Sequence, residues 1–200
     1  MKKISATLST IFLLSACAGL RSTYVFKENS ENSSYAPFWT VQSKAHKLDP
    51  SDEARQHLYF VGEAQESILR SCLKKAETQA VIKTASVPAG KIISRFLKIP
   101  RTGKRPDTAE LKEKMEQNIL TGLPKSVVIK EYWERREYLK EKGAKKDYTA
   151  YQCNVVVKLG KNDLAEAVEA YRAKIDKSLS GQNKKDLNKA IDYYVAGLKR

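Results

Sequence analysis

Apolar and polar positions along the chain predict a long amphipathic helix next to a short strand. From about Glu63 to Thr84, apolar residues recur at steps of three and four, which is typical of one buried helix face. The members of this stripe are Ile68, Leu69, Cys72, Leu73, Ala76 and Ala80. Pro88 and Gly90 are expected to end the helix. Directly before it, the aromatic and β-branched run Leu58-Tyr59-Phe60-Val61 predicts a strand.

The clearest β pattern lies on both sides of Lys142-Gly143-Ala144-Lys145. The flanking segments Ser126–Tyr138 and Lys146–Leu159 predict a long hairpin. In the second arm, alternation puts four residues on one face: Tyr151, Cys153, Val155 and Val157. In the first arm, the expected face contains Val127, Ile129 and Trp133, and the opposite face contains Val128 and Tyr132.

Two further helical regions complete the expected fold. Asp107 or Thr108 can cap a helix that runs to about Leu120. Its apolar side contains Leu111, Met115 and Ile119. Residues 161–200 form two apolar stripes interrupted at Gly181, which predicts a helical hairpin that begins at Asn162 or Asp163. The expected fold class is therefore α+β, with an antiparallel sheet of about three strands packed on a long helix and a C-terminal helical hairpin.

The N-terminal residues have the layout of a secretory signal. Lys2 and Lys3 precede the apolar segment Ile4–Leu14, and small residues follow. The sequence Leu14-Ser15-Ala16-Cys17 resembles the lipobox of bacterial lipoproteins, which implies removal of the preceding peptide and acylation, including palmitate, at Cys17. An ordinary secretory signal with a chance cysteine is the alternative.

The lipobox, the first aromatic cluster at Pro37-Phe38-Trp39 and the helical pattern after residue 160 divide the chain into four parts. We expect a signal peptide over residues 1–16, a lipidated N-terminus and flexible tether over 17–36, an α+β domain over 37–160 and a helical extension over 161–200. Ala18 follows the cysteine where an aspartate would favour retention in the inner membrane. The implied location is the cell envelope, lipid-anchored in the outer membrane and facing the periplasm.

Composition and net charge limit the classes of binding partner that we expect. The chain is 42% hydrophobic and 30% charged, which is ordinary for a folded soluble domain. Its formal net charge of +14 favours anionic neighbours such as lipid head groups or acidic polymers. Nucleic acid is also anionic, but an exported protein does not normally meet it, so no nucleic-acid partner is expected.

The remaining cysteines form an even pair in an oxidising compartment. We expect Cys72 and Cys153 to face each other, either as a disulfide or as two buried free thiols. His46 and His57 lack the spacing of metal ligands, so neither a metal nor a cofactor is expected.

Motifs that carry chemistry are absent from the sequence. No glycine stands where a phosphate-binding loop would need one before Gly90-Lys91, Gly103-Lys104 or Gly160-Lys161, and there is no nucleophile elbow. Glu110, Glu113 and Glu116 alternate with lysines, which is typical of a solvated helix face. We therefore expect no enzymatic activity and no catalytic residue.

The region 91–105 is the sharpest feature outside the expected core. It contains basic residues and no acid: Lys91, Arg95, Lys98, Arg101, Lys104 and Arg105. These side chains are the candidates for contact with an anionic surface. In a helix, Ile92, Ile93, Phe96 and Leu97 would share a face, which would either lie on a membrane or cover the core, and a core role is favoured.

Aromatic residues on the predicted hairpin allow a second binding hypothesis. They are Tyr132, Trp133, Tyr138, Tyr148 and Tyr151, and basic residues lie among them. Aromatic platforms with cations can bind sugars or nucleic-acid strands, but core packing and cross-strand pairing are favoured.

Several short motifs, in order, resemble the LPP20-type family of bacterial lipoproteins. They are Pro37-Phe38-Trp39, Leu58-Tyr59-Phe60-Val61-Gly62-Glu63-Ala64, Val128-Ile129-Lys130-Glu131-Tyr132-Trp133 and the strand Tyr151–Leu159. The resemblance covers about residues 37–170 and implies an envelope or surface lipoprotein with a small sheet on helices and no defining enzymatic activity. The last helix and region 91–105 look like additions.

Together these features predict a noncatalytic envelope lipoprotein that scaffolds or recruits a protein partner at the outer membrane. The alternative is a binding module for an anionic envelope polymer or lipid, such as peptidoglycan or lipopolysaccharide.

Overall fold

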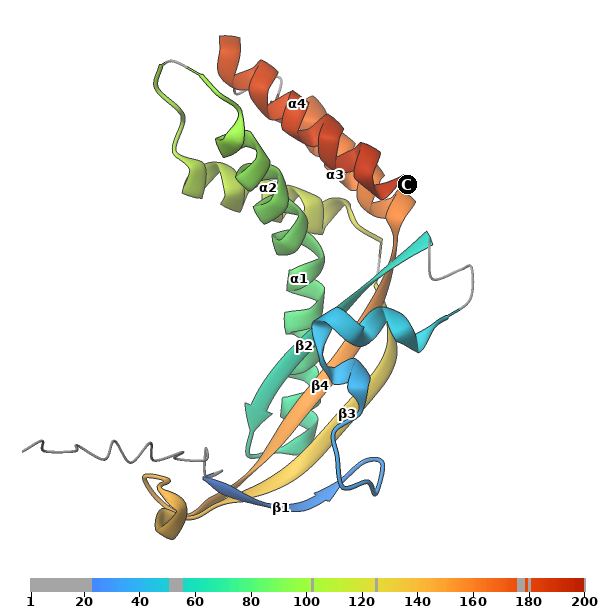
Figure 1. The fold of residues 1–200 in the computed structure, drawn as a ribbon, viewed down its shortest axis with the longest axis vertical. Helices are drawn as coiled ribbons and strands as arrows, with labels where there is room; N and C mark the ends of the chain where they lie inside the picture. Colours follow the sequence, from blue (N-terminus) through green and yellow to red (C-terminus); the bar gives the residue numbers. More distant parts are fainter. Residues whose placement is uncertain are drawn as a thin grey trace, which may run out of the picture.

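The computed structural model describes residues 23–50, 56–101, 103–124, 126–175, 179 and 181–199. The expected signal peptide and Cys17 lie outside these residues. The described chain forms an elongated α+β structure with a sheet at one end and packed helices at the other (Figure 1). The strands are β1 (Tyr24–Asn29), β2 (His57–Glu66), β3 (Val127–Tyr138) and β4 (Tyr148–Gly160). The α-helices are α1 (Leu69–Lys98), α2 (Thr108–Gly122), α3 (Lys161–Ile175) and α4 (Gly181–Leu198).

The predicted fold class is confirmed, with one strand more than expected. The sheet is antiparallel and has the order β1-β3-β4-β2, so the predicted hairpin of β3 and β4 forms its centre. The additional strand β1 pairs with β3, and the predicted tether is therefore wrong over Tyr24–Asn29. β1 is an edge strand that begins with Tyr24, Val25 and Phe26, and its Lys27 and Glu28 form ion pairs with Glu137 and Arg135 of β3. The run Tyr24-Val25-Phe26 is a local strand signal, whereas its pairing partner β3 lies far along the chain.

Helix α1 differs from its prediction at both ends. Residues 63–66 continue strand β2, and the helix begins at Leu69. It then passes through Pro88 and Gly90 to Lys98, so the expected break is wrong. A proline inside a helix costs about 3 kcal/mol. Burial of Ile92, Phe96 and neighbouring side chains against the other helices offsets this cost, since each large buried side chain contributes about 1.5–3 kcal/mol.

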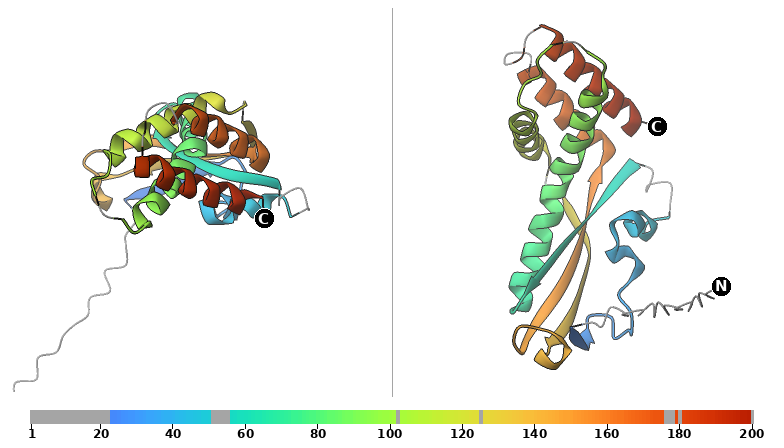
Figure 2. Two further views of the ribbon diagram at one scale, coloured as in Figure 1. Left: turned by 90° about the horizontal axis from the view of Figure 1, so that it is seen from above. Right: turned by 60° about the vertical axis from the view of Figure 1, so that its left-hand side comes forward.

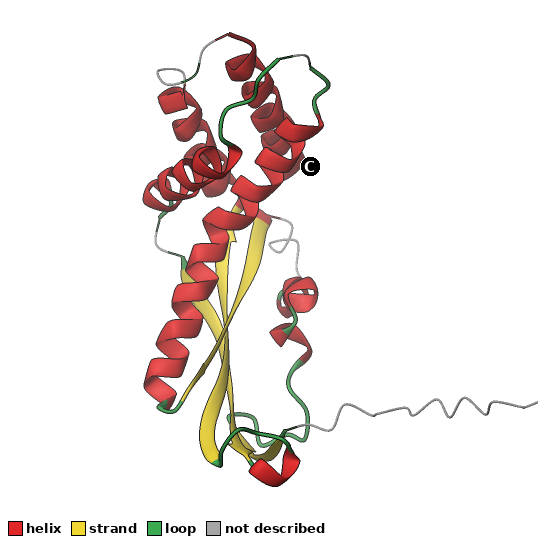
Figure 3. Ribbon diagram, turned by 90° about the vertical axis from the view of Figure 1, so that its left-hand side faces the viewer, coloured by secondary structure: helices red, strands yellow, loops and turns green. Residues whose placement is uncertain are grey.

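The two halves of α1 perform different packing roles. Its first half lies along one face of the sheet, and its second half extends beyond the sheet into the group formed by α2, α3 and α4 (Figure 3). Small residues allow the first half to approach β2 closely, because Ala76 and Ala80 lie directly against Gly62. The long helix thus joins the sheet to the helical end as one continuous element.

A β-bulge changes the predicted faces of β3. Val128 lies opposite Val157 and Lys130 lies opposite Val156, so Ile129 is an extra residue in the ladder. The bulge reverses the alternation: Val128 and Trp133 pack on the face that α1 covers. Ile129 and Tyr132 pack on the opposite face. The expected grouping of Val127, Ile129 and Trp133 on one face is therefore wrong.

Short 3-10 helices cover this opposite face of the sheet (Figure 2). They are η1 (Phe38–Thr40) and η2 (Gln42–Leu48). Another 3-10 helix, η4 (Lys140–Lys142), lies in the turn of the central hairpin and does not cover this face. Trp39 of η1 packs edge-to-face on the buried Tyr132, with ring centroids 6.3 Å apart. The Gln42 side chain donates to the Tyr59 carbonyl at 2.6 Å and accepts from the Val61 amide at 2.7 Å. This amide group thereby occupies the free edge of β2 as a neighbouring strand would.

Candidate functional site

The six basic residues predicted to contact an anionic surface divide into two groups in the structure. Lys91, Arg95 and Lys98 lie on the last turns of α1, whereas Arg101, Lys104 and Arg105 follow it in the loop toward α2. The apolar side chains between them mostly face inward: Ile92, Ile93 and Phe96 are buried in the main core, and Leu97 is exposed. This region therefore covers the core, as the favoured alternative predicted.

Arg101 is not available to an external anion, contrary to the sequence prediction. Its side chain is largely buried and forms an ion pair with Asp186 of α4, with Nη1 3.7 Å from Oδ2. It also donates to the side chain of Asn183 and to the carbonyl of Lys104. Arg101 therefore joins the end of α1 to the start of α4.

Arg105 is also used within the fold. Its guanidinium donates to the carbonyls of Leu97 at 2.7 Å and Ile99 at 2.8 Å, which are acceptors left open at the end of α1. Lys104 is exposed in the loop. Only the first group, Lys91, Arg95 and Lys98, lies where the structure forms a concave surface.

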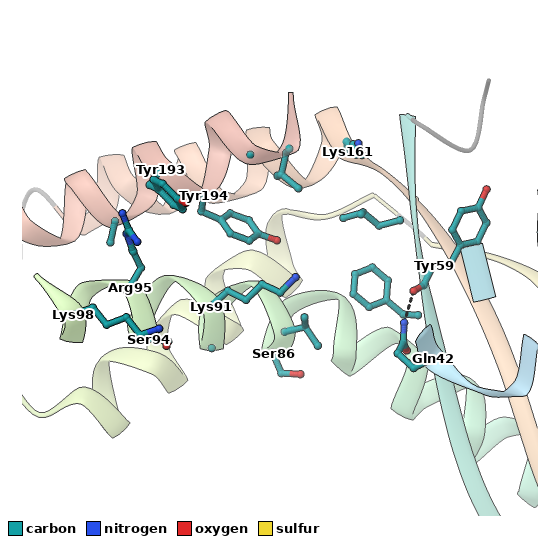
Figure 4. A pocket seen from close by; sticks show the side chains of 17 residues that line it. Gln42, Tyr59, Ser86, Lys91, Ser94, Arg95, Lys98, Lys161, Tyr193 and Tyr194 are labelled. Atoms are coloured by element: carbon teal, nitrogen blue, oxygen red, sulfur yellow. Dashed lines mark hydrogen bonds between the residues drawn. The ribbon is translucent and has the colours of Figure 1, made fainter. Parts of the chain in front are cut away.

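This concave surface is a groove of about 960 Å³ between α1 and α4, which we call the basic groove (Figure 4). Strand β2 and Gln42 border one end of it. Its volume is within the usual range of small-molecule sites, about 300–1,000 Å³. Small residues on the two helices, including Gly90, Ser94, Ala190 and Gly197, leave the space between them open.

The lining of the basic groove carries positive charge and no carboxylate. Its cations are Lys91, Arg95, Lys98 and Lys161, the last at the start of α3. The Arg95 guanidinium lies 3.8 Å from the centre of the Tyr193 ring, which fixes its position. In the described part of the chain, the two α1 lysines and Lys161 form no ion pair. Their charge is therefore uncompensated locally.

Tyr194 adds a hydrogen-bonding group to the basic groove. Burial raises the pKa of its phenol above the ordinary value, so the group stays protonated at neutral pH. Its hydroxyl has no hydrogen-bond partner among the described residues and is directed into the space between the helices (Figure 4). Lys91 is directed into the same space from α1. The groove thus combines cations with an unused donor.

Cys72 and Cys153 are joined by a disulfide, with Cα atoms 5.8 Å apart. Both cysteines are fully buried and lie in a cluster with Ala64, Ala76 and Val155. Of the two predicted arrangements, the structure has the bonded one. The bond fixes the beginning of α1 on the central strand β4.

The aromatic residues of the hairpin form core and cross-strand pairs. Tyr138 stacks on Tyr148 with centroids 4.5 Å apart, and Trp133 packs against Tyr151 at 5.8 Å. Tyr132 is buried and donates to Glu134 at 2.9 Å. These side chains are used in packing, as the favoured interpretation predicted.

The described residues contain neither a metal-binding cluster nor a membrane-spanning helix. No group of three or more histidine, cysteine or acidic side chains in these ranges could hold a metal ion. No helix in the same ranges is long and apolar enough to cross a membrane.

The sequence predicts the α1 side of the basic groove but not the side formed by α3 and α4. Lys161 enters the sequence analysis only as the end of an incomplete phosphate-binding loop, and Tyr194 belongs to the apolar stripe of the last helix. Nothing in the local pattern places them or Tyr193 beside Lys91, which lies far away along the chain. The adjacent tyrosines in a helix of otherwise regular pattern were the available signal, since Tyr193 falls outside the apolar stripe and is exposed.

Comparison with protein-family models gave no match to this chain, and comparison with curated proteins gave no significant match. The resemblance to LPP20-type lipoproteins therefore stays a prediction.

Proposed function

We propose that the protein is a noncatalytic envelope lipoprotein that binds an anionic envelope lipid or polymer in the basic groove. The observation that carries this proposal is the lining of the groove, which contains Lys91, Arg95, Lys98 and Lys161 without a carboxylate. Cations gathered in a concavity raise the local concentration of anions more than the same charges spread over a convex surface. The anchor in this proposal is the acylated Cys17, in the outer membrane and facing the periplasm.

The position of the basic groove suits a ligand in the envelope space. The described chain begins at Thr23, whose carbonyl accepts from Leu139 beside the turn of the central hairpin. The groove borders Tyr59, which pairs with Lys158 near the other end of β4. The strand between Tyr148 and Lys158 corresponds to about 33 Å at the usual rise per residue. An anchor at the N-terminus would therefore hold the domain by the end opposite to the groove.

Charge reversal in the basic groove should weaken binding to anionic material. We expect Lys91→Glu, Arg95→Glu and Lys98→Glu, combined in the full chain with Cys17→Ser, to reduce affinity for phosphatidylglycerol vesicles or peptidoglycan about tenfold or more at low salt. Cosedimentation measures the bound fraction. The matched control reverses Lys140, Lys142 and Lys145, which are exposed at the hairpin turn. Equal losses from both triplets would indicate diffuse whole-protein charge and contradict a groove site.

Acylation at Cys17 is a separate expectation. Labelled palmitate should enter the native chain in a Gram-negative host and should not enter the Cys17→Ser variant, because the thiol is the acceptor. Gel fluorography measures incorporation. A variant of Ser15 to Ala is the control, since it leaves the thiol in place. Undiminished label in Cys17→Ser would exclude the anchor and the proposed location.

Recruitment of a protein partner is the second candidate function. The segment after β1 exposes three large apolar side chains: Tyr35, Phe38 and Val41 are 84%, 50% and 49% exposed. Large apolar side chains that are exposed along one segment can contribute to a protein contact. A photo-crosslinking residue at Phe38 should give one defined adduct in cells, and the same residue at Lys142 should not. Identical adducts at both positions, or none, would remove this candidate.

A further inference from the structure

We propose that the basic groove binds a single-chain anionic amphiphile as a free monomer, with its head group at Lys91, Lys161 and Tyr194. This inference rests on the proposed function and names the ligand class. The apolar chain would lie along β2 and the adjoining face of α1, over Phe60 and Val87.

The head-group site has charge on both walls. Lys91 reaches into the groove from α1, and Lys161 stands across from it where β4 passes into α3 (Figure 4). The Tyr194 hydroxyl is directed between them and remains protonated, so it can donate to a carboxylate or phosphate oxygen. Charge-assisted hydrogen bonds from such donors are stronger than neutral ones. An anionic head group in this space would accept from the Tyr194 hydroxyl and would be attracted by the positive charge of both walls.

The part of the groove along β2 and the adjoining face of α1 is largely apolar, which favours a hydrocarbon over a sugar polymer. Val87 is 39% exposed although it lies within a concave lining, and Leu58 and Phe60 border the same space. A sugar polymer would bring hydroxyl groups that need polar partners when they leave water. The amide of Gln42, which could have served them, is already bonded to the backbone of β2 on both sides. A chain of methylene groups needs no such partners and gains from burial.

The place of the groove in the molecule favours a free monomer over a bilayer surface. The groove lies between two helices at the end of the domain remote from Thr23 (Figure 1), and Lys91 is directed into it (Figure 4). A flat bilayer could reach the rims of such a concavity, whereas a single chain could enter it. The ligand would therefore be taken up as one molecule in the envelope space.

Fluorescence titration of the full chain carrying Cys17→Ser with cis-parinarate tests this inference. We expect saturable binding that dodecyl phosphate displaces and dodecyltrimethylammonium does not, because the head-group site is cationic. Lys91→Glu should weaken affinity about tenfold through charge. Val87→Trp should weaken it similarly by filling the groove without changing charge. The control Ile82→Trp alters a comparably exposed aliphatic residue of α1 outside the groove and should bind as the parent does.

Several results would overturn the inference. These are absence of saturable binding, equal displacement by the cationic detergent, or equal losses in Ile82→Trp and Val87→Trp. If parinarate fails to bind while the charge-reversed triplet still loses affinity for peptidoglycan, the amphiphile is excluded and the broader function stands. Two independent variants, one of charge and one of shape, keep the test decisive if either fails to fold by circular dichroism.

Discussion

Loss of the Cys72–Cys153 disulfide should lower the free energy of unfolding by about 4.5 kcal/mol. The bond closes a loop with a sequence separation of 81 residues, and the chain-entropy model gives about this value for a loop of such length. It removes conformations from the unfolded chain and also fixes the first turns of α1 on β4. The expected effect is large beside a typical domain stability of about 5–15 kcal/mol.

Urea unfolding measures this effect. The oxidised parent, the reduced parent and the double variant Cys72→Ala with Cys153→Ala should be compared in a Cys17→Ser background. The reduced parent isolates the cross-link, and the double variant adds the small loss of buried sulfur atoms. Equal midpoints for oxidised and reduced protein, or free thiols at both positions in the oxidised chain, would contradict the bond.

Replacement of Gly62 by alanine should destabilise the protein by about 3 kcal/mol or prevent folding. A Cβ at this position would overlap the carbonyl oxygen of Ala76 and come within 2.9 Å of the Ala80 Cβ. Gly62 also pairs with Val155 inside the sheet, so neither backbone can retreat without loss of strand pairing or helix packing. Because the overlap is with backbone, a change of rotamer cannot relieve it.

Gly197→Ala is the matched control for Gly62→Ala. A Cβ at Gly197 in α4 would meet nothing within 4 Å, so this change should be neutral or stabilise the helix by up to about 1 kcal/mol. Thermal unfolding followed by circular dichroism compares the two variants with the parent. A melting temperature for Gly62→Ala equal to that of the parent would show that α1 is not packed on β2 at this distance.

The parts of the fold that were predicted correctly have sequence signals that lie within a few residues of the element they predict. The hairpin of β3 and β4 follows from alternation around a turn, and the start of α2 follows from Asp107, whose side chain accepts from the amides of Ala109 and Glu110. In each case the stabilising contacts are close in sequence. The local sequence pattern is therefore sufficient to predict these elements.

The errors occurred where distant contacts override local preference. Pro88 is a helix breaker by local chemistry, and burial of the following turns against α4 keeps the helix intact. Strand β1 combines Tyr24, Val25 and Phe26 with a polar end, the tether prediction follows from the polar residues around it, and its pairing depends on β3. The bulge at Ile129 reverses the faces of β3, and nothing in the local alternation marks an inserted residue.

The basic groove was predictable only in part for the same reason. Composition identified Lys91, Arg95 and Lys98 as uncompensated cations. It could not show that Arg101 pairs with Asp186, or that Lys161 and Tyr194 stand opposite them, because those partners belong to the C-terminal helices. A site formed between separate elements becomes visible only when the elements are packed.

Amide chemical shifts during titration with dodecyl phosphate below its micellar concentration test the central claim most directly. We expect saturable shifts at Lys91, Lys161 and Tyr194 in the full chain with Cys17→Ser, and unchanged shifts at the hairpin turn around Gly143. Shifts that are absent from these three residues, or that follow the exposed lysines of the turn instead, would contradict it.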